Sequence, residues 1–228
     1  MKLSIVIPVY NEEKTVKIII DKVRKADIAS VKKEIVVVDD GSSDRTAEIL
    51  SREQGIKLLK HGKNKGKGAA IRTGIKNATG DIIIIQDADL EYDPNDYMKL
   101  ISPIMKGEAS VVYGSRNLNS KNKMHSKRSF YIGGIILTMI TNLLYNTKLT
   151  DESTCYKVFK RGIIKSINLE CDRFEFCPEV TAKVAKKGIK ILEVPITYTP
   201  RHFDEGKKIK WSDGVAAIQT LLKYRFSD

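Results

Sequence analysis

The sequence predicts an α/β protein with a mostly parallel central sheet that is flanked by helices. Short apolar segments alternate with segments that carry apolar residues at helical spacing, and this alternation is typical of a parallel sheet. Four consecutive isoleucines, Ile82 to Ile85, predict a strand that is buried on both faces. Three expected strands end in polar or acidic clusters, at the edge where open α/β sheets bind ligands.

Seven apolar segments have the length and the bounding residues of strands. The expected strands are Lys2 to Val9, Glu34 to Val38, Ile56 to Lys60, Ile82 to Ile85, Ser110 to Tyr113, Tyr156 to Phe159 and Ile189 to Val194.

The segments between the strands carry apolar residues three and four positions apart, which predicts helices. The first helix is expected to have Asn11 as its N-cap and Glu12 and Glu13 in its first turn. Asp44 is a candidate cap of the second helix. The expected helices include Val16 to Val23, Thr46 to Gln54, Ala69 to Ala78, Asn95 to Lys106, Phe130 to Tyr145, Phe174 to Lys187 and Trp211 to Tyr224.

Length and composition predict one large domain with a real core, because 42% of the 228 residues are hydrophobic. The net charge of +12 predicts anionic partners such as nucleotide phosphates, nucleic acid or an acidic membrane surface. Three cysteines without paired spacing argue against a zinc site and fit a reducing cytoplasm. The chain starts with a strand and no signal peptide, so a cytoplasmic location is expected. The three histidines are expected on the surface.

The uncharged segment Phe130 to Tyr145 is shorter than the ~20 residues that a membrane-spanning helix needs. We expect a buried or interfacial helix. The basic residues before it, Lys121, Lys123, Lys127 and Arg128, suit an anionic membrane surface, and a plain core helix beside a solvated loop is an equal alternative.

Asp87 and Asp89 follow the isoleucine strand directly. Residues i and i+2 of an extended chain point the same way, so the two carboxylates can converge at the end of a central strand. A pair of carboxylates there can hold a hard divalent cation that bridges them to phosphate oxygens. An ordinary acidic turn is the alternative.

Other polar clusters are expected at the same edge. Asp40 can accept a hydrogen bond from a nucleotide base or a ribose hydroxyl. The basic, glycine-rich loop from His61 to Gly68 precedes a helix that carries Arg72, and such a loop can accept phosphate, although a solvated turn is an equal alternative. Asp151 lies between apolar segments, where it is either a pocket carboxylate with a raised pKa or a turn residue.

Taken together, these segments resemble the inverting family 2 glycosyltransferases with the GT-A fold. Within that family the chain is most similar to the polyprenyl-phosphate (dolichyl-phosphate) hexose synthases, which use GDP-mannose or UDP-glucose. The resemblance covers nearly the whole chain and depends on Val6 to Glu12, Ile35 to Ser42 with Asp44, Asn64 to Gly74, Gly80-Asp81 with Asp87 to Asp89, and Gly114 to Arg116.

The resemblance implies that residues 1–117 bind the nucleotide sugar and that residues 118–228 form an acceptor-side half with interfacial helices. It places Mg²⁺ or Mn²⁺ on Asp87 and Asp89, and the acceptor phosphate near Arg116, Arg128 and Arg201. The implied donor-binding residues are Pro8, Val9, Tyr10, Asn11, Glu12, Asp40, Lys67, Arg72, Asp87, Ala88 and Asp89.

The acceptor decides whether a general base is needed. A lipid phosphate is already charged at neutral pH, because its second pKa is about 6. It therefore needs arginines more than a base. A sugar hydroxyl, as in glycan or polysaccharide synthesis, is the alternative acceptor, and Asp151 or Asp89 would then be the catalytic base.

The sequence also departs from the family. Relatives often continue into transmembrane segments, whereas this sequence stops at Asp228, so a soluble or peripheral protein, or one with a separate membrane protein partner, is expected. Glu91 stands where relatives often have Gln, and Lys208 follows Arg201 one residue later than expected. Thr150 to Tyr156 departs from the pattern of the mannose enzymes, which leaves the sugar open.

Two other classes of function remain as alternatives. A basic nucleic-acid-binding domain fits the charge, but the acidic strand ends and the lack of a recognised motif argue against it, so nucleic acid is not expected as a partner. A nucleotidyltransferase would share the α/β layout and the metal carboxylates, but the sequence has no strong glycine-rich loop for a triphosphate.

Overall fold

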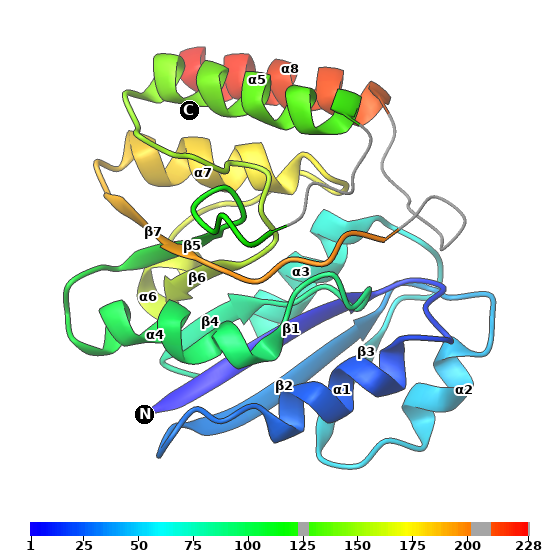
Figure 1. The fold of residues 1–228 in the computed structure, drawn as a ribbon. Helices are drawn as coiled ribbons and strands as arrows, with labels where there is room; N and C mark the ends of the chain where they lie inside the picture. The colour runs from blue at the N-terminus through cyan, green and yellow to red at the C-terminus, as the bar shows by residue number, and fades with distance from the viewer. Residues whose placement is uncertain (123–127, 202–210, 228) are drawn as a thin grey trace.

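The structure is a computed structural model that describes residues 1–122, 128–201 and 211–227. The described residues form a seven-stranded sheet in the order β3-β2-β1-β4-β6-β5-β7 (Figure 1). Within it, β6 runs antiparallel to β4 and β5, and the other pairs are parallel, so the expected mostly parallel sheet is confirmed. The strands are β1 (Lys2–Val9), β2 (Lys32–Asp39), β3 (Ile56–Lys60), β4 (Ile82–Ile85), β5 (Val111–Ser115), β6 (Lys157–Lys160) and β7 (Ile191–Pro195).

Helices connect the strands and pack against the sheet. The expected helices are all present, and two short elements, η1 and α6, were not predicted. The helices are α1 (Val16–Lys25), α2 (Thr46–Ser51), α3 (Lys67–Asn77), the 3-10 helix η1 (Pro94–Asp96), α4 (Tyr97–Met105), α5 (Arg128–Tyr145), α6 (Arg161–Lys165), α7 (Phe176–Lys186) and α8 (Trp211–Phe226).

The core forms where β1, β2 and β4 lie side by side. Ile82 to Ile85 are at most 1% exposed, as a strand that is buried on both faces should be. Helix α3 packs on this part of the sheet through Gly74, where any side chain would collide with Val6 of β1. The apolar strands and the helix that covers them therefore form the hydrophobic core of the sheet.

Strand register brings the predicted clusters to one edge. Val9 pairs with Asp39 across β1 and β2, and Val6 pairs with Ile85 across β1 and β4. The residues that follow these strands therefore emerge together at the carboxyl edge of the sheet.

Helices α5, α7 and α8 form a layer above the end of the sheet that contains β5 and β7 (Figure 1). Ala182, Leu221 and Tyr224 form a small second core in it. Among the described residues, no helix combines the length and the apolarity that crossing a bilayer requires.

The predicted N-cap of α1 is wrong. The helix begins at Val16 and has no acidic residue in its first turn. Asn11 instead adopts a left-handed conformation, and its side chain accepts a hydrogen bond from Ser43 N at 2.8 Å. This bond ties the end of β1 to the loop after β2, so Asn11 connects two strands. Asp44 does accept a bond from Thr46 N in the first turn of α2, at 2.9 Å, although Arg45 is the cap residue.

Candidate active site

The two aspartates after β4 each face a basic side chain. Both oxygens of Asp87 lie close to Lys67 Nζ, at 2.6 and 2.7 Å. Asp89 Oδ2 lies 3.4 Å from Arg201 Nη2, and the other oxygen of Asp89 accepts a bond from Glu91 N at 3.1 Å. Lys67 begins α3 and Arg201 follows β7, so the fold brings three distant parts of the chain to this edge.

The charged side chains at this edge shift one another's pKa values. Burial, with the nearby charges of Asp87 and Glu91, raises the pKa of Asp89 to about 7. Burial alone would lower the pKa of Lys67, but the carboxylate of Asp87 outweighs it and raises that pKa. The carboxylates of Asp87, Asp89 and Glu91 therefore repel one another at this edge, and the charges of Lys67 and Arg201 offset that repulsion.

The donor set fits Mg²⁺ or Mn²⁺, because both ions prefer carboxylate oxygens. Within the described ranges, no three His, Cys, Asp or Glu side chains group into a metal site by themselves. Asp87 and Asp89 therefore suit a metal whose remaining ligands come from a substrate, as Mg²⁺ usually binds with substrate phosphates.

Glu12 and Glu91 hold the segment that follows β7. The two oxygens of Glu12 accept bonds from the guanidinium of Arg201 at 3.0 and 3.1 Å. Glu91 accepts bonds from Arg201 N at 2.7 Å and from the Tyr198 hydroxyl at 3.0 Å. Sequence reasoning treated Glu91 as a departure from the family and did not predict this contact, because it joins positions more than one hundred residues apart.

Asp40 is 2% exposed and organises the basic loop after β3. It accepts bonds from Lys65 N at 3.0 Å and Gly66 N at 2.7 Å, and it lies 2.6 Å from His61 Nδ1. The carboxylate can only accept, so Nδ1 of His61 carries a proton, and Nε2 lies 2.9 Å from Thr73 Oγ1. The predicted surface position of His61 is therefore wrong: its side chain is 8% exposed.

Glycine is required where the loop meets Asp40. Gly41 has a φ of +72°, and an added Cβ would lie 2.6 Å from the carbonyl carbon of Lys63. The other side of the loop packs on residues 171–173, where Ala69 N donates to the Asp172 carbonyl at 3.0 Å. The amides of Lys65, Gly66 and Ala69 thus have protein partners, and Lys67 is the group of this loop that reaches the acidic edge.

Arg72 lies on α3, but its side chain contacts the segment before α7 and not the acidic edge. Its guanidinium donates to the Leu169 carbonyl at 3.1 Å, and it also contacts the Glu170 carbonyl and the carboxylate of Asp172. These contacts fix the segment before α7 on α3. A donor-binding role for Arg72 stays a prediction.

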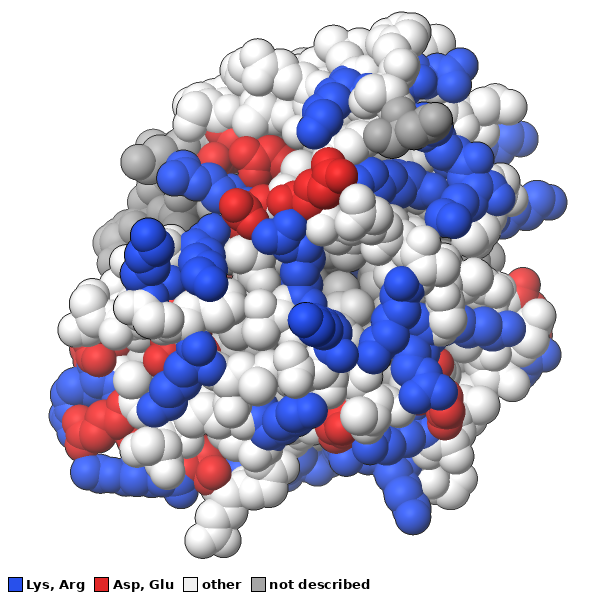
Figure 2. Space-filling view, turned by 180° about the vertical axis from the view of Figure 1, so that it is seen from behind, with Lys and Arg blue, Asp and Glu red and all other residues white. Residues whose placement is uncertain are grey.

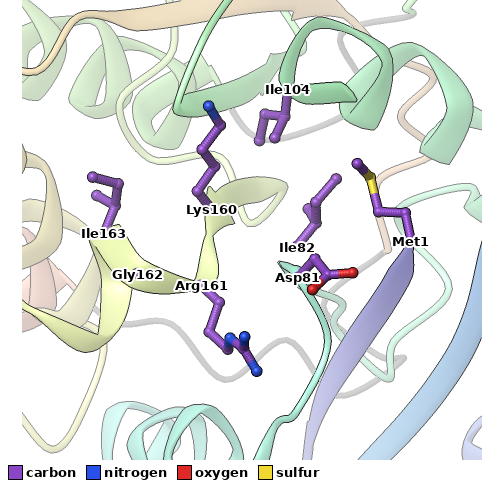
Figure 3. A pocket seen from close by; sticks show the side chains of 8 residues that line it. All are labelled: Met1, Asp81, Ile82, Ile104, Lys160, Arg161, Gly162 and Ile163. Carbon is purple, nitrogen blue, oxygen red and sulfur yellow. The ribbon is translucent and has the colours of Figure 1, made fainter. Parts of the chain in front are cut away.

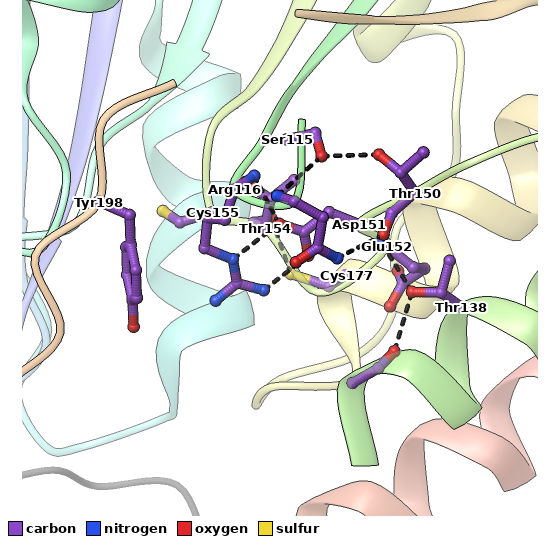
Figure 4. Close-up of polar contacts among 12 residues, drawn as sticks. Ser115, Arg116, Thr138, Thr150, Asp151, Glu152, Thr154, Cys155, Cys177 and Tyr198 are labelled. Atoms are coloured by element: carbon purple, nitrogen blue, oxygen red, sulfur yellow. Dashed lines mark hydrogen bonds and ion pairs between the residues drawn. The ribbon is translucent and has the colours of Figure 1, made fainter. Parts of the chain in front are cut away.

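Arg116 and Asp151 form an ion pair between the end of β5 and the segment before β6 (Figure 4). Arg116 Nη2 and Nε donate to the two carboxylate oxygens at 2.6 and 2.7 Å, and Arg116 N adds a bond at 2.9 Å. The ring of Tyr198 lies 5.1 Å from the guanidinium. Glu193 of β7 stabilises the position of Asp151, because it accepts a hydrogen bond from Asp151 N at 3.0 Å.

The ion pair gives Asp151 a role that sequence reasoning missed. Both of its oxygens hold Arg116, so the carboxylate orients a guanidinium and is not poised to take a proton from a hydroxyl. The base role of Asp151 stays a prediction that this geometry does not support. Arg128 begins α5, and its side chain lies outside the described residues, as do His125, His202 and Lys208.

A cavity of about 370 Å³ lies at the opposite edge of the sheet, beside the first residue of β4 (Figure 3). Ile82, Ile104 and Ile163 line it with Met1, and the side chains of Lys160 and Arg161 point in opposite directions there. This largely apolar hollow lies at the amino end of β4, away from Asp87 and Asp89.

Basic side chains spread over the back of the molecule, and acidic side chains lie among them in several patches, with one cluster in the upper part of the view (Figure 2). The chain carries 40 Lys and Arg against 28 Asp and Glu, and the basic side chains of this face do not gather in one stripe.

The fold is of the GT-A-like α/β class. The structure is similar to solved structures of glucosyl-3-phosphoglycerate synthase from Mycobacterium tuberculosis. The complex with Mg²⁺ and UDP has a TM-score of 0.76 at 21% identity and covers 98% of this chain and 79% of that one. The complex with Mn²⁺, UDP-glucose and phosphoglyceric acid has a TM-score of 0.74 at 20% identity, with the same coverage.

The family follows from the sequence match. The model of the glycosyl transferase family 2 matches residues 4–167, and the chain belongs to that family. A UDP-N-acetylglucosamine–dolichyl-phosphate N-acetylglucosaminyltransferase of Methanococcus voltae is 31% identical and covers 85% of this chain and 84% of the relative. The dolichol-phosphate mannosyltransferase of Pyrococcus furiosus is also 31% identical, over 91% of this chain and 59% of the relative. An uncharacterised protein of Methanocaldococcus jannaschii is 33% identical, over 91% of this chain and 86% of the relative.

Proposed function

We propose that this glycosyltransferase moves a hexose, with inversion, from a GDP-mannose-type or UDP-glucose-type donor to a polyprenyl or dolichyl phosphate. The observation that carries the proposal is that one guanidinium group contacts the acidic edge and that a second one packs on the same segment of the chain. Arg201 contacts Glu12 and Asp89, and Tyr198 of the same segment packs on Arg116. Guanidinium groups bind phosphate oxygens in a bidentate way, which suits an anionic acceptor next to the donor.

The donor half is residues 1–117. Asp40 and the loop that it holds lie beside the ends of β1 and β2, where the base would bind against Pro8, Val9, Tyr10, Asn11 and Ala88. Asp87 and Asp89 would hold Mg²⁺ or Mn²⁺, which stabilises the charge that develops on the leaving diphosphate. Lys67 is positioned to add a second positive charge to the same phosphates.

The acceptor half is residues 118–228, together with Arg116. A phosphate monoester carries its own negative charge at neutral pH, so its oxygen can attack the anomeric carbon without a base. Arg116, Arg128 and Arg201 would orient that phosphate on the face of the sugar opposite the leaving group. Attack from that face inverts the anomeric configuration.

The acceptor lipid implies work at a membrane surface. Helix α5 exposes Ile132, Ile136, Met139 and Leu143, which repeat at helical spacing and are 47% to 85% exposed. Helix α8 packs beside it and exposes Trp211, Val215, Leu222 and Phe226. We propose that this apolar face rests on the cytoplasmic surface of the bilayer, with or without a separate membrane protein.

A direct transfer assay tests the proposal. The purified chain is incubated with a panel of labelled UDP- and GDP-sugars, a polyprenyl phosphate in detergent, and Mn²⁺ or Mg²⁺. We expect transfer to the lipid phosphate from one donor, and its loss with EDTA. Transfer only to a sugar hydroxyl, or from no donor of the panel, would contradict the proposal.

A further inference from the structure

We propose that Lys67 and Arg201 are the resident counter-cations of the donor site. They neutralise Asp87 and Asp89 while no donor is bound, and the divalent cation therefore enters together with the nucleoside diphosphate and not before it. The inference rests on the proposed function, and it adds an order of binding that depends on two side chains of this chain.

Lys67 makes the tighter of the two contacts. Its ammonium lies within 2.7 Å of both oxygens of Asp87, and the side chains are only 25% and 13% exposed. The ring of Phe174 covers the ammonium at 5.7 Å. A metal that binds Asp87 must therefore compete with the partly buried ammonium of Lys67, which already contacts both carboxylate oxygens.

Arg201 does the same for the second aspartate, with a looser contact. Its Nη2 atom lies 3.4 Å from Asp89 and 3.0 Å from Glu12, so the guanidinium spans two carboxylates at the edge where the metal would bind. Glu91 holds the backbone of Arg201 in place at 2.7 Å. The main chain of Arg201 is thus fixed by the same acidic edge that its side chain neutralises.

A free metal ion that displaced these side chains would leave a sheltered ammonium without its carboxylate, which is unfavourable. A nucleoside diphosphate removes that obstacle, because its oxygens are good partners for Lys67, while Arg201 keeps its contact with Glu12 beside the acceptor phosphate. Metal and nucleotide should therefore strengthen each other's binding, and this coupling must be reciprocal.

The experiment measures Mn²⁺ binding directly, by electron paramagnetic resonance of the free ion, without substrate turnover. The whole chain is titrated alone and in the presence of UDP or GDP. For the unchanged protein we expect Mn²⁺ to bind at least about tenfold more tightly with the matching nucleotide. In Lys67→Met, Mn²⁺ alone should bind about tenfold more tightly than in the unchanged protein, and the gain from the nucleotide should shrink.

Two further variants keep the result interpretable. Arg201→Gln should shift Mn²⁺ binding in the same direction by a smaller factor, and it serves if Lys67→Met does not fold. Lys76→Met is the matched control, because it removes an exposed lysine from the far end of the same helix and should leave Mn²⁺ binding unchanged.

The outcomes separate this inference from the proposed function. Equal Mn²⁺ affinity with and without nucleotide, or no gain in Lys67→Met and Arg201→Gln, would overturn the counter-cation role while the donor site stands. Failure of the unchanged protein to bind any nucleotide, with or without Mn²⁺, would overturn both.

Discussion

Arg116 and Asp151 face each other through two side-chain hydrogen bonds of 2.6 and 2.7 Å, and the aspartate is 3% exposed. Burial would lower the pKa of Arg116, but the charge of Asp151 outweighs it and keeps the guanidinium charged. The Arg116 side chain is 25% exposed, so the pair is only partly buried, and removing one partner would leave the other charge uncompensated. We therefore expect the pair to act as one unit.

The first prediction concerns Asp151→Asn. The amide keeps the shape but loses the charge that orients Arg116, so the KM for the lipid phosphate should rise about tenfold or more with a smaller loss of kcat. Steady-state kinetics with varied acceptor measures both. Arg116→Met should behave alike, and the double variant should be little worse than either single one. A collapse of kcat at constant acceptor KM in Asp151→Asn alone would instead favour the base role.

The second prediction concerns Asp89→Asn. We expect transfer to fall at least about 100-fold, because the metal loses a charged ligand. The fold should survive, since burial, Asp87 and Glu91 raise the pKa of this carboxyl and its charged form therefore weakens the folded state near neutral pH. Thermal unfolding should show an unchanged or higher Tm. Asp21→Asn, a change at a partly exposed position of α1, is the control. Unaltered transfer by Asp89→Asn would remove the metal from the mechanism.

The third prediction concerns His61, which positions Asp40. His61→Ala should leave the buried carboxylate with its two backbone amides and loosen the loop from His61 to Gly66. The KM for the donor should rise about tenfold while the KM for the acceptor stays constant. Thr73→Val removes the hydrogen bond between Thr73 Oγ1 and Nε2 of His61, and it should raise the KM for the donor by a smaller factor. An effect confined to the acceptor KM would count against a donor-side role for His61.

The fourth prediction concerns the apolar face of α5 and α8. Leu143→Asp and Phe226→Asp each place a charge at a position that is more than 80% exposed, so folding should be unaffected. Sedimentation with vesicles that contain anionic lipid should fall several-fold for these variants, because burial of apolar area drives interfacial binding. Ile18→Asp on α1, which is 47% exposed, is the matched control. If all three variants sedimented with the vesicles as much as the unchanged protein does, the membrane contact would lie elsewhere on the protein.

The fifth prediction concerns stability at low pH. Burial would raise the pKa of Glu34, but hydrogen bonds from Ser4, Thr79 and Lys2 outweigh it and lower the pKa to about 2, below the ordinary value of 4.5. The unfolded chain therefore binds this proton more readily. The stabilisation is complete above about pH 4.5 and is lost as the pH falls towards 2.

Glu34→Gln tests this linkage. After allowance for solvent screening, the pKa shift corresponds to about 2 kcal/mol near neutral pH. Urea unfolding at a series of pH values should show that the variant is less stable at pH 7 and that the difference narrows below pH 4.5. A difference that stays constant across this range would mean that Glu34 acts through packing and not through its charge.

Most of the fold was predictable because it depends on local patterns. The isoleucines of β4 and the helical spacing in α1 lie within single segments, so neighbouring residues were enough to assign them. The errors occurred where a contact joins distant segments. Asn11 caps no helix because it bonds Ser43 of the next loop, and His61 is buried because Asp40 and Thr73 lie on either side of its ring.

The sequence by itself determined the class of protein, the polar clusters that follow the strands and the two aspartates of the candidate metal site. Each of these features depends on a short run of neighbouring residues. Only the tertiary structure decided which charges meet. Lys67 faces Asp87, Arg201 spans Glu12 and Asp89, and Arg116 is held by Asp151. Ion pairs of this kind depend on distances of a few ångströms between elements far apart in the chain, and those distances are set by strand register and helix packing.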